Sequence, residues 1–132
     1  MEFQLGTEVR QKLAANLARR PEILFAILYG SAAEPGLPFR DIDIGVFVNR
    51  QVVSVEQELA YMFSLANELE RLIAYPVDVR VINDAPPGFR YNVSRGEPLT
   101  VRDERAFYTF LERAWDDYLD FAPLTKRYWQ EL

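Results

Sequence analysis

YGSAAEPGLPFRDID, residues 29–43, lies between two apolar runs and holds the features around which the rest of the chain can be arranged. The run before it, Ile23–Tyr29, ends at a Gly30-Ser31 pair, and the run after it is Ile42–Val48. Short apolar runs bounded by glycine and proline are typical of buried strands. The middle of the segment contains two prolines and a glycine, so it predicts a loop.

Composition bounds the class of protein. The chain has 132 residues, of which 49% are hydrophobic, and this predicts a single domain spanning residues 1–132 with a packed core. Cysteine is absent, which excludes disulfides and thiolate zinc sites. Histidine is also absent, which excludes histidine bases, Ser-His-Asp and Cys-His devices and histidine metal sites. Catalysis by this chain would therefore use carboxylates, hydroxyls, Lys, Arg, Tyr or a hard cation held by oxygen.

The charge and hydropathy of the chain narrow its partners. The net charge is −5 and no long basic run occurs, so direct binding to bare nucleic acid is disfavoured. No apolar run approaches the ~20 residues that a membrane span needs. The N-terminus lacks the basic start and apolar core of a signal peptide. We therefore expect a soluble cytoplasmic protein without a membrane partner.

Hydrophobic periodicity predicts the order helix, strand, strand, helix, strand and then mostly helix. Helical segments are expected at Thr7–Arg19, Ser31–Glu34 (a single turn), Ser54–Ala74, Pro86–Ser94 and from Asp103 to about Phe121, with a last turn or two in Pro123–Leu132. Strands are expected at Ile23–Tyr29, Asp41–Val48, Val77–Ile82 and, at one edge, Leu99–Val101. The fold class is therefore α/β (α+β): a small mixed sheet with helices packed on one face and the other face open.

The two longest helices have clear apolar patterns. Ser54 and Gln57 have the spacing of a capping box at the start of the first. Its expected buried stripe is Val55, Leu59, Met62, Phe63, Ala66, Leu69 and Ile73. The last helix is expected to bury one side, formed by Phe107, Leu111, Ala114 and Tyr118.

Gly30-Ser31 ends the first expected strand and begins a helical turn. Free backbone N–H groups and a hydroxyl at such a place suit phosphate oxygens, and Gly30 has no side chain to block a close approach. A plain turn explains the same pair, so a phosphate role needs support from elsewhere in the chain.

Three aspartates belong to the expected strands. Asp41 and Asp43 alternate with apolar residues, so at period two they point to the same side. Like charges this close repel each other unless a cation lies between them, although a solvated strand face is the alternative. Asp78, in the apolar strand VDVRV, either pairs with Arg80 or joins the other two aspartates in an oxygen site for Mg²⁺.

Phosphates at Gly30-Ser31 and metal at the three aspartates describe phosphoryl or nucleotidyl transfer from a triphosphate. In this interpretation Asp41 and Asp43 bridge two metal ions, and Asp78 holds the ion that activates the nucleophile. The interpretation requires three acidic side chains from separate strand segments to converge on a shared cation beside the Gly-Ser turn.

Gly30-Ser31, nine intervening residues, Asp41-Ile42-Asp43 and a later strand with Asp78 resemble the motif of the DNA polymerase β-like nucleotidyltransferase superfamily. The similarity spans nearly the whole chain and is greatest to the minimal nucleotidyltransferase (MNT, MntA-like) antitoxins. It implies an α/β nucleotidyltransferase core that transfers AMP from ATP to a tyrosine of a HEPN-domain toxin, an RNase-like partner, with Mg²⁺. It assigns the Gly-Ser pair to the nucleotide phosphates and the three aspartates to metal and catalysis.

One part of the motif departs from this family. Many relatives carry an Arg-Gly pair shortly after the Gly-Ser and a Ser before the first Asp, where this chain has Ala33-Glu34 and Arg40. Arg40 is either a further ligand of the triphosphate or a solvated side chain. The departure leaves the nucleotide preference open.

Two alternative functions remain. The protein could neutralise a toxin by binding alone, or it could modify a small molecule or an RNA end, although such enzymes usually bring a further domain for the acceptor. A partner interface is one reading of the C-terminal aromatic residues, and a core with scattered surface aromatics is the other. These residues are Phe107, Tyr108, Phe110, Trp115, Tyr118, Phe121, Tyr128 and Trp129.

Overall fold

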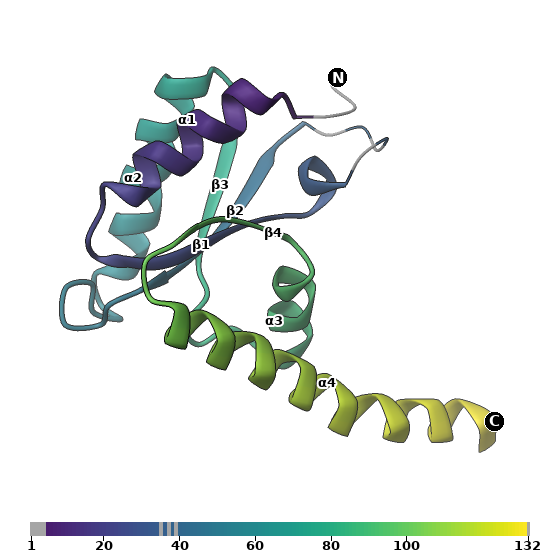
Figure 1. Cartoon of the computed structure of the whole chain (residues 1–132). Helices are drawn as coiled ribbons and strands as arrows, with labels where there is room; N and C mark the ends of the chain where they lie inside the picture. The colour runs from purple at the N-terminus through teal and green to yellow at the C-terminus, as the bar shows by residue number, and fades with distance from the viewer. Residues whose placement is uncertain (1–4, 35, 37, 39, 132) are drawn as a thin grey trace.

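The computed structural model describes the backbone of residues 5–34, 36, 38 and 40–131 and the side chains as far as residue 119. Helices and strands follow one another in the expected order (Figure 1). The elements are α1 (Thr7–Ala18), β1 (Ile23–Tyr29), the short 3-10 helix η1 (Ser31–Ala33), β2 (Ile42–Val48), α2 (Glu58–Ile73), β3 (Val77–Val81), α3 (Pro87–Ser94), β4 (Glu97–Val101) and α4 (Glu104–Glu131).

The four strands form one mixed sheet in the order β3-β2-β1-β4. β1 is antiparallel to both of its neighbours, and β2 is parallel to β3. A parallel pair needs a crossover connection, and α2 supplies it. The expected mixed α/β sheet is therefore confirmed.

One face of the sheet is covered by α1 and α2, as expected (Figure 1). Alternate residues of β2 point into this layer, because side chains along a strand alternate between faces. The main core contacts come from Leu13 and Leu17 of α1, Leu65, Leu69 and Ile73 of α2, and Ile42, Ile44, Val46 and Val48 of β2.

The expected stripe of α2 is partly wrong. The helix begins at Glu58, and Gln57 accepts a hydrogen bond from the Ser54 N–H at 3.0 Å in the turn before it. Val55, Leu59 and Phe63 are 59%, 61% and 64% exposed. Leu59 and Phe63 lie on one flank of the apolar stripe, because each residue turns the helix by about 100°. The sheet ends at β3, so that flank has no strand to pack against.

The second face of the sheet differs from the expectation of an open surface. α3 and α4 pack over β1, where a second apolar cluster is buried. Its members are Phe25, Ile27, Tyr29, Ile82, Val93, Phe107 and Phe110. The β1 run is apolar on both faces, which is the signature of a strand covered on both sides. On this face Asp43, Phe47 and Asp78 are half-buried, and Arg80 is exposed.

The last helix is longer than expected. α4 runs without a break to Glu131, past Phe121 and through Pro123, and its C-terminal part extends away from the sheet (Figure 1). Asp103 caps it, accepting a hydrogen bond from the Ala106 N–H at 3.0 Å. In the part of the chain that the structure describes, no helix is long and apolar enough to cross a membrane.

The aromatic residues of α4 divide between core and surface. Phe107 and Phe110 are buried, whereas Tyr108, Trp115 and Tyr118 are exposed. The Tyr118 ring stacks on the Tyr91 ring of α3 with centroids 3.9 Å apart, and the Trp115 ring meets the same ring edge-on. The side chains of Phe121, Tyr128 and Trp129 lie outside the described residues.

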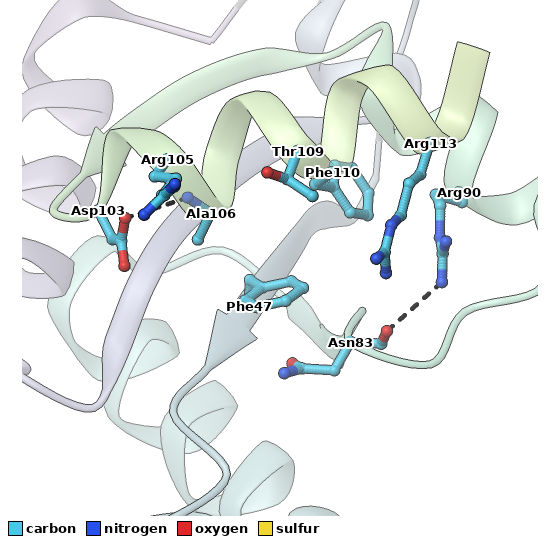
Figure 2. Close-up of a pocket in the computed structure, with 9 residues that line it drawn as sticks. All are labelled: Phe47, Asn83, Arg90, Asp103, Arg105, Ala106, Thr109, Phe110 and Arg113. Carbon is cyan, nitrogen blue, oxygen red and sulfur yellow. Dashed lines mark hydrogen bonds between the residues drawn. The ribbon is translucent and has the colours of Figure 1, made fainter. Parts of the chain in front are cut away.

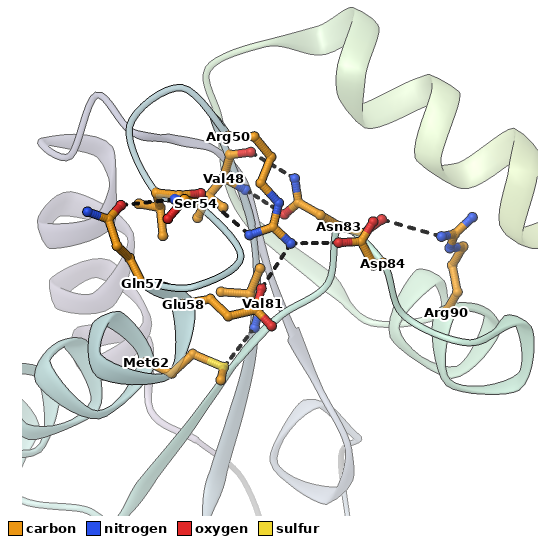
Figure 3. A network of polar contacts seen from close by, with 11 residues as sticks. Val48, Arg50, Ser54, Gln57, Glu58, Met62, Val81, Asn83, Asp84 and Arg90 are labelled. Atoms are coloured by element: carbon orange, nitrogen blue, oxygen red, sulfur yellow. Dashed lines mark hydrogen bonds and ion pairs between the residues drawn. The ribbon is translucent and has the colours of Figure 1, made fainter.

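A polar network joins the C-terminal ends of β2 and β3, the ends that lie away from Asp43 and Asp78 (Figure 3). Arg50 pairs with Glu58 at 2.9 Å and with Asp84 at 2.7 Å. The Asn83 amide exchanges two hydrogen bonds with the Val48 backbone, at 2.9 and 2.8 Å. These contacts fix the position of the segment that leads from β3 into α3.

Candidate functional site

A row of polar side chains crosses three strands at one end of the sheet. In the register, Tyr29 of β1 lies opposite Asp43 of β2, and Asp43 lies beside Asp78 of β3. Directly paired residues on neighbouring strands project to the same face, so the two carboxylates are neighbours. The fold therefore brings together two of the three aspartates named from the sequence.

The two carboxylates repel each other. The pKa of Asp43 is raised, first by burial and then by the negative charges of Asp78 and Asp41, while Arg80 acts in the opposite direction. Arg80 donates a hydrogen bond from Nε to Oδ2 of Asp78 at 3.3 Å, and its side chain is 58% exposed. An exposed guanidinium compensates only part of this charge. A divalent cation bound by the carboxylate oxygens would compensate the remaining negative charge.

Asp41 lies one residue before β2 and is exposed. Its charge reaches Asp43, whose pKa it helps to raise. Among the described residues, no three acidic side chains stand close enough together to form a ready-made metal site. The structure thus places Asp43 and Asp78 side by side, and the role of Asp41 as a metal ligand stays a prediction.

Only glycine fits at position 30, because the Asp43 carboxylate occupies the space where a side chain would begin. The φ of 75° and ψ of −160° of Gly30 lie in a region that is essentially restricted to glycine. A Cβ atom at Gly30 would lie 2.5 Å from Oδ2 of Asp43. The turn after β1 and the carboxylate on β2 are therefore packed against each other, which places the Gly-Ser turn at the site.

A small pocket of about 160 Å³ lies beside the Gly-Ser turn. Gly30, Ala33 and Glu34 form one wall, and Asn92, Arg95, Gly96 and Glu97, from the end of α3 to the start of β4, form another. Ser31 begins η1 next to this pocket and is half-buried. Arg40, the other expected nucleotide ligand, is exposed in the loop before β2.

Two residues at the site were missed from the sequence. Tyr29 is buried, and its pKa is raised by burial and by the charges of Asp43 and Asp78, so its hydroxyl keeps its proton. Because Tyr29 directly precedes Gly30, its position in the sequence was a signal that it belongs to the site. Arg95 reaches the pocket from a helix more than sixty residues later in the chain, and no local pattern points to it.

A groove of about 410 Å³ runs between α2 and the edge strand β3. Its apolar wall includes the exposed side chains of Leu59 and Phe63. Asp78 and Arg80 line the same groove. The groove therefore joins an exposed apolar surface to the edge strand that carries one of the paired aspartates.

The family model "Polymerase beta, Nucleotidyltransferase" matches residues 11–105, a segment that contains the Gly-Ser turn and all three aspartates. The chain belongs to this nucleotidyltransferase family. The sequence-based recognition of the superfamily is thereby confirmed. No curated protein sequence matched the chain.

Several solved structures share the fold of this nucleotidyltransferase. A chain in the crystal structure of the toxin–antitoxin MntA-HepT aligns with a TM-score of 0.66 and 16% identity, covering 95% of this chain and 97% of that one. A chain in the complex of tri-AMPylated Shewanella oneidensis HEPN toxin with MNT antitoxin aligns with a TM-score of 0.66 and 17% identity, covering 94% and 96%. A chain in a toxin–antitoxin structure with AMP-PNP aligns with a TM-score of 0.69 and 18% identity, covering 92% and 96%.

Proposed function

We propose that this nucleotidyltransferase is an antitoxin that transfers AMP from ATP to a tyrosine of a HEPN-domain toxin. The observation that carries the proposal is the pairing of Asp43 with Asp78 beside the Gly30 turn. A side chain at Gly30 would clash with the Asp43 carboxylate. The fold match, over 94% of this chain, to a chain in a complex of tri-AMPylated HEPN toxin with MNT antitoxin supports the choice of acceptor. The match to a complex with AMP-PNP supports the choice of nucleotide.

Asp41, Asp43 and Asp78 would hold Mg²⁺, which supplies charge neutralisation at the phosphates and lowers the pKa of the attacking hydroxyl. The tyrosine oxygen of the acceptor forms a bond to the α-phosphorus of ATP. The bond from that phosphorus to the β-phosphate breaks, pyrophosphate leaves, and the phenolic proton passes to solvent.

Other residues of this chain bind and orient the reactants. Backbone N–H groups at Gly30 and Ser31 would bind the nucleotide phosphates. Arg95 would add a positive charge in the small pocket, which also contains Glu34 and Glu97, and Glu97 is paired with Arg10. Arg80 holds the Asp78 carboxylate in place. The protonated Tyr29 hydroxyl is a neutral hydrogen-bond donor beside Asp43, on the side away from Asp78. ATP is a cytoplasmic substrate, and we place the reaction in that compartment.

The α2–β3 groove suits a protein acceptor. It combines exposed apolar side chains with the edge strand that carries Asp78, so a toxin segment bound there would lie beside the site. The exposed side chains of Leu59 and Phe63 provide an apolar contact surface that suits a protein acceptor better than a small molecule.

Labelled ATP tests the proposal. The purified protein is mixed with a HEPN-domain toxin, Mg²⁺ and ATP labelled at the α-phosphate. We expect label on the toxin with the wild-type protein, a loss of about a hundredfold or more with Asp43→Asn or Asp78→Asn, and no change with Asp116→Asn, an exposed aspartate of α4.

A different outcome would support the binding-only alternative. If the wild-type protein leaves the toxin unlabelled while Asp43→Asn still neutralises it in cells, then neutralisation does not depend on nucleotidyl transfer. Such a result would refute the proposed chemistry.

A further inference from the structure

A further cavity, of about 310 Å³, is lined by residues of β2, α3, α4 and the segments that lead into these two helices (Figure 2). Phe47 of β2 and Phe110 of α4 form its apolar floor. Phe47 follows Asp43 by four residues in the same strand and on the same face, a separation of roughly 13 Å. The cavity is therefore distinct from the nucleotidyl-transfer site.

Three arginines line this cavity. Arg105, Thr109 and Arg113 follow one another at intervals of four along α4, so they lie on one side of the helix. Arg90 enters from α3 (Figure 2). Asp103 is the only acidic residue among the lining residues, and it caps α4. Three arginines and one aspartate give the lining a net charge of +2.

These guanidinium groups are incompletely paired. Arg90 Nη1 lies 3.8 Å from Asp117, Nη2 donates to the Asn83 carbonyl at 3.4 Å, and the buried Nε has no hydrogen-bond partner among the described residues. Arg105 and Arg113 form no ion pair with the side chains that the structure describes. Figure 2 shows Arg90 and Arg113 extending in the same direction, toward Asn83.

We propose that this cavity binds a phosphate monoester, as a small-molecule ligand, in its dianionic form. Arg90 and Arg113 extend in the same direction with like charges, and an anion between them would offset their repulsion. Guanidinium groups bind phosphate through paired, charge-assisted hydrogen bonds, and the lining charge of +2 matches a dianion better than a carboxylate. Thr109 and Asn83 add neutral polar groups, and the phenyl rings add an apolar surface for the remainder of the ligand.

The size of the cavity favours a small molecule over a macromolecule. A volume of about 310 Å³ is at the lower end of the range of small-molecule pockets. The net charge of the whole chain is −5, which opposes binding of a polyanion beyond the reach of these arginines.

Arginine Nε–H signals in ¹H–¹⁵N NMR spectra test the proposal one residue at a time. Inorganic phosphate is the probe at about pH 8, where it is mostly the dianion. Acetate at equal ionic strength is the control anion. We expect saturable shifts of the Arg90 and Arg113 signals with phosphate and much smaller shifts with acetate. The Arg95 signal reports any binding at the other pocket.

Substitution of an exposed arginine separates a site from general charge attraction. Arg113→Gln is expected to weaken phosphate binding about tenfold, whereas Arg71→Gln, which removes an exposed arginine of α2, leaves it unchanged. Phosphate shifts that do not saturate would overturn the proposal. So would equal binding of acetate, or equal weakening by Arg71→Gln.

Discussion

Gly30 and Asp43 depend on each other, although they are thirteen positions apart in the sequence. The backbone of Gly30 adopts a left-handed conformation, and the space where a side chain would begin is occupied by the Asp43 carboxylate. The glycine therefore acts on the site in two ways. It allows the chain to turn from β1 into η1, and it leaves room for the acidic group at the centre of the polar row.

We expect Gly30→Ala to disrupt this arrangement. The strained backbone costs about 1–3 kcal/mol of stability. Displacement of the carboxylate by a distance on the order of 1 Å costs about a hundredfold in transfer rate. Thermal unfolding and the labelled-ATP assay measure the two effects.

Gly88→Ala is the matched control, because a Cβ atom at Gly88 meets nothing within 4 Å. It is expected to leave both stability and activity close to wild type. An active Gly30→Ala protein would show that the Asp43 carboxylate can move without loss of function.

The period-two alternation of β2 and β3 explains why Asp43 and Asp78 could be predicted from the sequence. Alternation fixes the face on which a side chain lies, and a parallel register then places the two residues next to each other. The position of Arg95 depends on how α3 packs over β1. That packing is a tertiary contact, and neither composition nor periodicity determines it.

At the scale of elements, α2 shows the limit of periodicity. The sequence predicts an apolar stripe along α2, and this stripe is wider than the side of the helix that the sheet covers. Leu65, Leu69 and Ile73 are buried, whereas Leu59 and Phe63 overhang the edge strand. A sequence pattern identifies apolar side chains but does not show where the sheet ends. The overhanging residues are the ones that line the groove beside the edge strand that carries Asp78.

If the toxin docks in this groove, as the proposed function requires, Phe63→Ser should weaken its recognition. We expect the KM for the toxin to rise about tenfold, because exposed aromatic anchors contribute strongly to protein interfaces. Affinity for ATP should not change. Stability should change by less than about 0.5 kcal/mol, because the side chain is 64% exposed.

Leu72→Ser tests the same helix outside the groove. Leu72 is 39% exposed and does not line the groove, so this variant is expected to keep the wild-type KM. Equal effects of the two substitutions would place toxin docking elsewhere on the molecule.

At the scale of the whole molecule, the sheet is covered unequally on its two faces. α1 and α2 cover one face, while α3 and α4 cover β1 on the other and leave Asp43 and Asp78 half-buried. The aspartates alone predict an open face, whereas the apolar residues of β1 predict a strand that is covered on both sides. The burial of the β1 side chains on both faces shows why a second helical layer was needed.

This arrangement leaves acidic charge at the edge of a packed core, and we expect it to reduce the stability of the whole protein. Burial and the charge of Asp78 raise the pKa of Asp43 in the folded state. Between the usual pKa and the raised one, the folded protein binds more protons than the unfolded chain, so stability falls as the pH rises through that range. Above the raised pKa the whole penalty is present.

Asp43→Asn should therefore raise the free energy of unfolding at neutral pH, by about 0.5 kcal/mol after allowance for solvent screening. The difference from wild type should vanish below the usual pKa of a carboxyl group. Mg²⁺ should stabilise the wild-type protein and leave Asp43→Asn unchanged, because a ligand that binds only the folded state stabilises it. Thermal unfolding across pH, with Mg²⁺ or EDTA, measures both effects. A variant less stable than wild type at neutral pH would mean that the folded protein stabilises the Asp43 charge, which would remove the electrostatic argument for a cation between the two strands.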